Sequence, residues 1–135
     1  MRPTGMVDAL HAAHRAVKRG GYIVDARPDA SRHPRILARD RVRAYLRQCP
    51  DTDERDARAD RAVAQLIGEG ALMPVRTGRV WHSSRFVDLR ELDGYVRDSG
   101  RYCEYERGTR RALLPFRKGP LFMRRAIRFA VLKVV

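Results

Sequence analysis

Residues 9–25 read ALHAAHRAVKRGGYIVD, and this stretch decides the fold that the sequence predicts. Apolar side chains in and before it recur at the spacing of one helical face: Met6, Leu10, Ala13 and Val17. We expect Thr4 to cap this helix and the pair Gly20-Gly21 to end it and turn the backbone. The apolar run Tyr22–Ala26 follows without alternation, which is typical of a strand covered on both faces, as in a parallel sheet. The order of helix, glycine pair and strand predicts an α/β protein.

The next part of the chain predicts a loop, a hairpin and a second helix. Residues 29–34 are rich in loop-forming side chains. Residues 35–48 alternate between apolar and basic side chains, which indicates two strands joined at Arg39-Asp40. A helix that begins near Asp40 is the alternative, since the turn has no glycine. An acidic first turn and an apolar stripe then predict a helix over residues 51–67.

The last part of the chain predicts a second hairpin, two further helices and a final strand. Thr77-Gly78 lies between two β-rich runs, residues 71–75 and 80–86, and is typical of a hairpin turn. Asp88-Leu89-Arg90-Glu91 has the form of a capping box and predicts a helix that extends toward Gly100. We expect one short helix within residues 101–120. The β-rich residues 127–135 predict the last strand.

The segment 9–25 resembles the pattern ALxEAxRVLxPGGxLLxD of class I S-adenosylmethionine-dependent methyltransferases. In that family the pattern joins the helix before the fifth strand to the strand itself. Arg19 stands where the family has proline. The resemblance implies that Ile23 and Val24 are buried and that the later elements follow the order found after the fifth strand. It implies an α/β fold: a partial Rossmann-like methyltransferase sheet from the fifth strand onward, with helices and one or two β-hairpins, in a single domain over residues 1–135.

The resemblance also implies that the cofactor site lies elsewhere. In the family, a glycine-rich turn after the first strand and an acidic residue after the second hold S-adenosylmethionine, at the carboxyl ends of the strands. This sequence corresponds to the elements that follow. Its Gly68-Glu69-Gly70 leads from a helix into a strand, the reverse order, and we interpret it as a helix stop. We therefore expect no cofactor for this chain alone, and S-adenosylmethionine only if the missing half is supplied.

Four residues are candidates for substrate binding, although the sequence assigns no catalytic residue and no metal site. Asp25 and Arg27 end the first strand, where open α/β sheets place their ligands. The alternative is that Asp25 caps the loop that follows. Trp81 and His82 are neighbours in a strand, so at most one of them faces a pocket. The alternative for Trp81 is a place in the core or in an interface.

The net charge of +13 is concentrated at the two ends of the chain. Residues 1–50 carry +7 and residues 101–135 carry +8, whereas residues 51–100 carry −2. A basic protein attracts phosphate backbones, so nucleic acid is a candidate partner. The alternative is codon bias, because twenty-six of the twenty-nine basic residues are arginine. The sequence has no membrane-length apolar run and no secretory signal, which predicts a cytoplasmic protein with reduced cysteines.

Three functions remain open. The first is a methyltransferase-like protein that lacks its own S-adenosylmethionine motif, either truncated or in need of a complementary half, and that we do not expect to be an active enzyme alone. Its Tyr22–Ala26 strand would then have an open edge, suited to a homodimer or to a complementary protein. The second is a small basic nucleic-acid-binding protein. The third is a protein-interaction module that completes the sheet of another protein.

Overall fold

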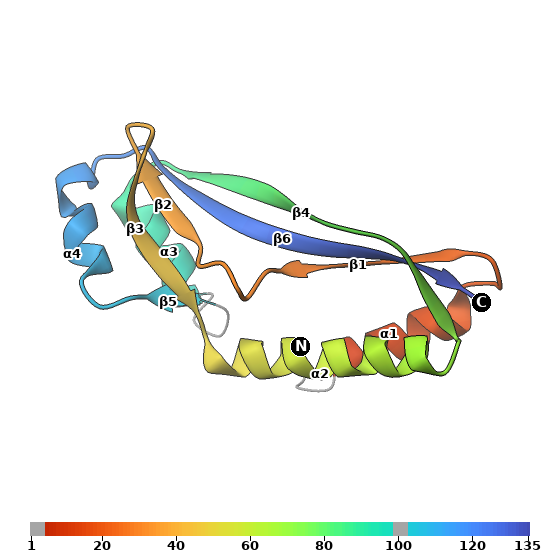
Figure 1. Cartoon of the computed structure of the whole chain (residues 1–135). Coiled ribbons are helices and arrows are strands. Elements are labelled where there is room, and N and C mark those ends of the chain that lie inside the picture. Colours follow the sequence, from red (N-terminus) through yellow and green to blue (C-terminus); the bar gives the residue numbers. More distant parts are fainter. Residues whose placement is uncertain (1–4, 99–102) are drawn as a thin grey trace. The chain divides into compact units, whose positions relative to one another are not determined.

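The computed structural model describes residues 5–98 and 103–135, and it is an α/β structure, as predicted. The elements follow in the order α1 (Gly5–Ala16), β1 (Tyr22–Pro28), β2 (Arg35–Ala38), β3 (Arg41–Gln48), α2 (Pro50–Gly68), β4 (Leu72–Phe86), α3 (Leu89–Asp98), β5 (Cys103–Tyr105), α4 (Thr109–Leu113), the 3₁₀ turn η1 (Leu114–Phe116) and β6 (Leu121–Val134) (Figure 1). The strands form an open antiparallel sheet, so the interpretation of Tyr22–Ala26 as a strand of a parallel sheet is wrong. None of the described helices is long and apolar enough to cross a membrane.

The described residues group into two compact units. Unit 1 contains those of Met1–Arg27, Asp53–Arg79 and Arg128–Val135, and unit 2 contains those of Pro28–Thr52 and Val80–Ile127. Neither unit is a continuous stretch of chain, because α2, β4 and β6 each contribute residues to both. The prediction of one folding domain over residues 1–135 therefore stays a prediction. Thr4 and Gly100, which were expected to flank helices, lie outside the described residues.

In unit 1, the C-terminal part of β6 lies between β1 and β4. The amide of Gly20 donates to the carbonyl of Val134 at 2.8 Å, and the amide of Val134 donates to the carbonyl of Gly21 at 2.8 Å. On the other side of β6, the amide of Val135 donates to the carbonyl of Ala71 at 3.1 Å. Since β1 and β4 are both antiparallel to β6, they run in the same direction as each other without being neighbours.

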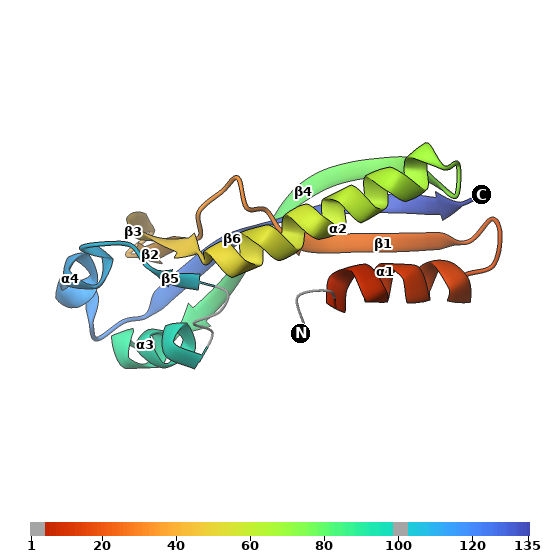
Figure 2. The ribbon, with the colours of Figure 1, turned by 90° about the horizontal axis from the view of Figure 1, so that it is seen from below.

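Both helices of unit 1 cover the same face of these strands (Figure 2). A core of buried apolar side chains fills the space between them: Leu10, Ile23, Leu66, Leu72, Leu132 and Val134. The apolar stripes that predicted α1 and α2 supply the helical side of this core. Ile23 is buried, as the resemblance implied. Val24, however, is 65% exposed, so the expectation that it is buried is wrong.

The exposure of Val24 has a simple cause. Successive side chains of a strand point to opposite faces, and α1 and α2 cover only the face that holds Ile23. The absence of alternation in Tyr22–Ala26 predicted cover on both faces. An apolar side chain in a strand can be buried, but it is buried only where a second layer of structure covers its face of the sheet. Unit 1 has one such layer among its described residues.

In unit 2, residues 35–48 form the predicted hairpin rather than a helix, with β2 and β3 paired so that Ala38 lies opposite Arg41. Arg39 and Asp40 both have positive φ, 51° and 61°. Such a two-residue turn matches the twist of the strands it joins, and glycine or asparagine usually forms it. Arg39 and Asp40 are neither of these residue types, so they do not indicate such a turn in the sequence. β2 pairs with the N-terminal part of β6, and β5 pairs with β3.

The second predicted hairpin is wrong: residues 72–86 form one continuous strand, β4, which pairs with β6. Gly78 is not a turn residue. A Cβ atom at Gly78 would lie 2.6 Å from the ring of Phe129, so the glycine leaves room for that ring. Trp81 and His82 therefore lie within a long strand and not in the second arm of a hairpin. The last strand is also longer than predicted, because β6 begins at Leu121.

The predicted cap of α3 by Asp88 is confirmed, because its carboxylate accepts a hydrogen bond from the amide of Glu91 at 2.9 Å. This bond satisfies one of the amides that a helix leaves without partners at its start. The return bond of the capping box is shifted by one residue, because the carboxylate of Glu91 accepts from the amide of Val87 at 2.6 Å rather than from that of Asp88. The short helix expected within residues 101–120 is α4. Cys49 and Cys103 are both buried, and they form no disulfide within the described part of the chain.

The expectation that Gly20-Gly21 ends the first helix is wrong, because α1 ends at Ala16 and the glycine pair lies in the turn that leads into β1. This turn gives a first prediction. Replacing Gly21 with alanine should destabilise the protein by about 1–3 kcal/mol, as overpacking does. The new Cβ would lie 2.6 Å from Cγ1 of Val17 and 2.9 Å from the carbonyl oxygen of Lys18. Gly68→Ala is the control, because nothing lies within 4 Å of its Cβ position. Urea unfolding measures both, and a Gly21 variant as stable as the Gly68 variant would contradict the packing described here.

Candidate functional site

Two of the predicted site residues, Asp25 and Arg27, belong to a cluster of charged side chains in unit 1. We call it the Arg27 cluster, and its members are Asp25, Arg27, Asp56, Asp60 and Arg128. Arg27 forms a two-pronged ion pair with Asp25, in which Nε and Nη2 donate to the two carboxylate oxygens at 2.9 Å each. Its Nη2 also donates to Asp60 at 2.6 Å, and its Nη1 donates to the carbonyl of Asp56 at 3.0 Å.

The cluster connects three elements of unit 1. Asp25 and Arg27 lie on β1, Asp56 and Asp60 on α2, and Arg128 on β6. Arg128 donates to the same Asp60 oxygen at 2.6 Å. Burial lowers the pKa of Arg27, but its hydrogen bonds and charge interactions with Asp25 and then Asp60 outweigh burial and leave the pKa raised. Arg27 therefore stays charged and holds α2 against β1.

Asp25 and Arg27 also line a pocket, as expected of residues at the end of a strand. The pocket has a volume of about 380 Å³ and lies among α1, β1 and α2. Most of the other residues that line it are apolar: Met6, Ala9, Leu10, Ala13, Ile23, Val24, Ala26, Ala59 and Val63. Because the two charged groups are paired with each other, the geometry favours a structural role for them over substrate binding. The proposed cap of the following loop is instead supplied by Asp29, whose carboxylate accepts from the amide and hydroxyl of Ser31.

The other two predicted site residues, Trp81 and His82, lie on the part of β4 that belongs to unit 2. Both are exposed, Trp81 narrowly so. The guanidinium carbon of Arg35 lies 4.7 Å from the centre of the Trp81 ring, and that of Arg124 lies 5.8 Å away. Both are within the range of cation–π contacts. Trp81 therefore anchors two arginines rather than filling the core. Of the four predicted site residues, Asp25 and Arg27 lie in unit 1 and the other two lie in unit 2.

Sequence reasoning missed a polar triad in unit 2. The hydroxyl of Tyr105 donates to Asp93 at 2.6 Å, and Nη2 of Arg110 donates to the same carboxylate at 3.0 Å. Burial raises the pKa of Asp93, but the hydrogen bonds from Arg110 and Tyr105 outweigh burial and leave it lowered. Burial and the Asp93 carboxylate both raise the pKa of Tyr105. The triad connects α3, β5 and α4, and no spacing in the sequence indicates that these residues meet.

The exposed face and edge of β1 are the other feature of unit 1. Tyr22 and Val24 are 57% and 65% exposed, and they point away from the helices because Ile23 between them faces the core. Met73 of β4, next to the buried Leu72, is 48% exposed in the same way. β1 pairs with β6 on one side, and no strand in the described part of the chain pairs with its other side. Unit 1 therefore presents an apolar face next to a free strand edge.

S-adenosylmethionine, which the resemblance implies, does not fit the described residues. Its site requires a glycine-rich turn that leads from a strand into a helix. Within residues 5–98 and 103–135, the strands that lead into helices are β3, β4 and β5. Only the connection after β5 contains a glycine, Gly108, and it opens a helix of five residues. The described residues also contain no cluster of three or more side chains that could hold a metal ion.

The Arg27 cluster gives a second prediction. Arg27→Met should destabilise the protein by about 3 kcal/mol, since it leaves buried carboxylates without their cation. The side chain of Arg27 is 11% exposed and that of Asp56 is 7% exposed. Arg128→Met removes the more exposed cation of the same cluster and should cost roughly 0.5 kcal/mol. Thermal and urea unfolding compare the two, and equal losses would show that Arg27 is not the centre of the cluster.

The triad gives a third prediction, which depends on pH. Asp93→Asn should cost about 2 kcal/mol at neutral pH, because hydrogen bonds to a carboxylate are lost. The lowered pKa of Asp93 means that this contribution is complete above about pH 4, the unfolded value, and is lost as the pH falls through the folded value. The stability difference between the wild type and the variant should therefore shrink in acid. Asp98→Asn, at an exposed position, should cost little at any pH.

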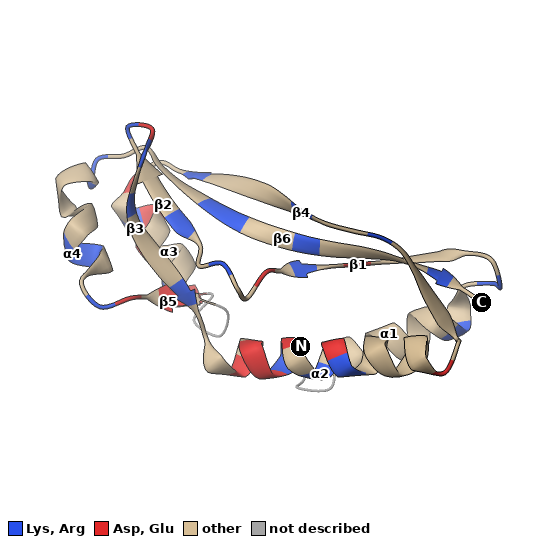
Figure 3. Ribbon diagram, viewed as in Figure 1, with Lys and Arg blue, Asp and Glu red and all other residues tan. Residues whose placement is uncertain are grey.

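The chain offers, then, one satisfied cluster of charges, an anchored pair of arginines, a structural triad and a bare sheet face with a free edge. Figure 3 marks the positions of Lys and Arg in blue and of Asp and Glu in red along the ribbon. Of these, the bare face and the free edge leave a surface without partners in the described part of the chain. Comparison of the chain with protein-family models, with curated proteins and with solved structures finds no match.

Proposed function

We propose that this chain is the second half of a class I S-adenosylmethionine-dependent methyltransferase-like fold. It docks through β1 onto a complementary half, which supplies the cofactor site, and it is inactive alone. The complementary half belongs either to another polypeptide or to another segment of the same one. A cytoplasmic location is part of this proposal.

The observation that carries the proposal is the free edge of β1. The helix, glycine pair and strand that resemble the methyltransferase pattern lead directly into this strand. In the family, the strand that follows the pattern is the fifth, so it has a neighbour from the first half of the sheet. Here the corresponding side of β1 pairs with nothing in the described residues. An unpaired edge exposes a row of amides and carbonyls that readily accept another strand.

The bare face beside that edge supports the same proposal. Rossmann-like sheets carry helices on both faces. In unit 1, α1 and α2 cover one face, while Tyr22, Val24 and Met73 are exposed on the other. A complementary half that adds strands at the edge of β1 and helices over this face would cover both features together. The proposed inactivity of the chain alone is supported by the glycine pattern, since the described residues contain no turn suited to S-adenosylmethionine.

Nucleic-acid binding is the second candidate function, and one observation favours it. Trp81 is exposed, and the guanidinium groups of Arg35 and Arg124 both lie close to its ring. Aromatic rings beside cations are the surfaces on which single-stranded nucleic acids stack their bases. The surface has a single aromatic ring, however, whereas such proteins use several along a groove.

The free edge gives a fourth prediction. Without its complementary half, the chain should self-associate through β1 at micromolar concentrations, because a second copy can pair with the open edge and cover the apolar face. Val24→Lys should shift the sedimentation profile toward the monomer, since it places a charge in the centre of that face. Val42→Lys is the matched control, because Val42 is also an exposed strand valine, at 41%, but lies in unit 2.

Two further measurements test the docking role and the absence of a cofactor site separately. Hydrogen exchange of the peptide that contains residues 22–26 should be slower in the associated wild type than in the Val24→Lys variant. Calorimetric titration of the chain with S-adenosylmethionine should show no saturable binding. A wild type that is monomeric, with rapidly exchanging β1 amides, would overturn the docking role. Saturable cofactor binding by the chain alone would overturn the assignment to the second half.

A further inference from the structure

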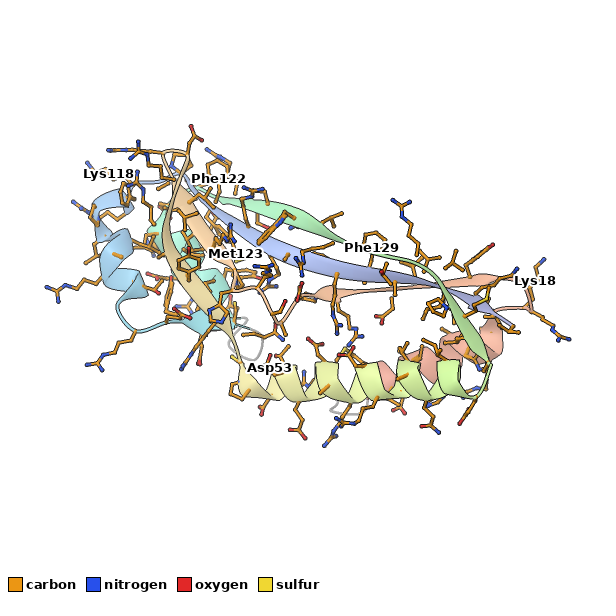
Figure 4. All side chains as sticks on the ribbon, in the orientation of Figure 1. Lys18, Asp53, Lys118, Phe122, Met123 and Phe129 are labelled. Atoms are coloured by element: carbon orange, nitrogen blue, oxygen red, sulfur yellow. The ribbon has the colours of Figure 1, made fainter. Side chains whose placement is uncertain are left out.

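A basic pocket lies in unit 2, between the β2–β3 turn and the segment that joins η1 to β6. Its volume is about 460 Å³, which is within the usual range for small-ligand sites, about 300–1,000 Å³. The residues that give the pocket its chemistry are Arg39, Asp40, Phe116, Arg117, Lys118 and Phe122. Figure 4 labels Lys118 and Phe122, which lie at the same end of unit 2. Three cations therefore face one carboxylate, beside two aromatic rings.

The cations of this pocket differ from those of the Arg27 cluster and of the Asp93 triad in their partners. Arg27 and Arg110 are both matched by carboxylates at hydrogen-bond distance. In the described part of the chain, by contrast, Arg39, Arg117 and Lys118 make no ion pair with a carboxylate. Their charge is therefore not neutralised by a direct contact, and an anion that enters the pocket meets an excess of positive charge.

The aromatic ring of Phe116 holds this charge in place. The guanidinium carbon of Arg39 lies 5.6 Å from the centre of the ring, and that of Arg43, just beyond the lining, lies 4.4 Å away. Nε of Arg43 also donates to the carbonyl of Ala38 at 3.0 Å. A guanidinium held over a ring keeps most of its N–H donors available, and its fixed position lowers the entropy cost of binding a ligand.

The backbone fixes the opposite wall of the pocket. The amide of Arg117 donates to the carbonyl of Leu114 at 3.2 Å, and the amide of Gly119 donates to the carbonyl of Phe116 at 2.9 Å. The carbonyl of Arg117 accepts from the amide of Leu89 at 3.0 Å. These bonds anchor the segment that carries Arg117 and Lys118, so both side chains start from a fixed backbone at the mouth of the pocket.

We propose that this pocket binds the phosphate group of a ligand that also has an apolar part. The phosphate contacts Arg39, Arg117 and Lys118, whose N–H groups form strong hydrogen bonds to phosphate oxygens. The apolar part lies against Phe122 and the neighbouring prolines of the lining, Pro115 and Pro120. The phosphate belongs either to a free nucleotide-like compound or to a nucleic-acid strand. The site is independent of the proposed docking of β1, since all of its residues lie in unit 2.

Calorimetric titration with two probes tests this site: inorganic pyrophosphate and a single-stranded thymidine oligonucleotide. The double variant Arg117→Ala, Lys118→Ala should bind about tenfold more weakly than the wild type, because charge-assisted bonds to phosphate are lost. The matched control is Arg15→Ala, Arg19→Ala, which removes the same net charge from exposed positions in unit 1. Its affinity should stay within about twofold of the wild type, since rim charges act weakly. If the double variant unfolds more easily, Lys118→Ala alone takes its place.

Each possible result of these titrations either supports or overturns the proposal. Binding of either probe that the pocket variant weakens and the control keeps supports it, and the probe that binds identifies the source of the phosphate. Binding of pyrophosphate indicates a small ligand, and binding of the oligonucleotide alone indicates a nucleic-acid strand. Failure of both probes to bind at millimolar concentration overturns the proposal. Equal weakening in the pocket variant and the control also overturns it, because binding would then follow net charge.

Discussion

The hydrogen bonds of β6 are the interaction on which the structure depends. In unit 1, its C-terminal part holds β1 and β4 on its two sides, and in unit 2 its N-terminal part holds β2. A strand with neighbours on both sides satisfies its own backbone groups and those of the strands beside it. β1, β2 and β4 all pair with β6, while β3 joins the sheet through β2 and β5 joins it through β3. The proposed docking surface lies on the side of β1 that β6 does not pair.

β1 illustrates this dependence. Its pairing with β6 uses one side of the strand and leaves the other without a partner in the described residues. The Arg27 cluster then fixes α2 over one face of β1, so the helices cannot cover both faces at once. β1 therefore has one paired edge and one covered face, while its other edge is free and its other face is bare. This combination is what a sheet that awaits further strands requires, and it is the physical basis of the proposed docking role.

Charge serves different purposes in the two units. In the Arg27 cluster, the cations meet carboxylates and hold the fold. In the pocket beside Phe116, the cations lie over an aromatic ring or on an anchored turn, and they keep their charge for a ligand. The net charge of +13 is therefore not evenly available. Part of it is neutralised by carboxylates inside the structure, and part lacks such a partner, as in the pocket beside Phe116, which explains why composition alone is a weak guide to a partner.

The sequence by itself determined the elements whose signals are local. The first helix, the strand that contains Tyr22–Ala26 and the cap of α3 by Asp88 each depend on residues within a few positions of one another, and each forms where the sequence predicts it. The tertiary structure decided what depends on distant neighbours. Gly78 lies opposite Phe129 instead of in a turn, and Val24 is exposed because no second layer covers it. The partners of Arg27 and Asp93 and the pocket beside Phe116 also join segments far apart in the chain, and spacing along a sequence carries no information about such contacts.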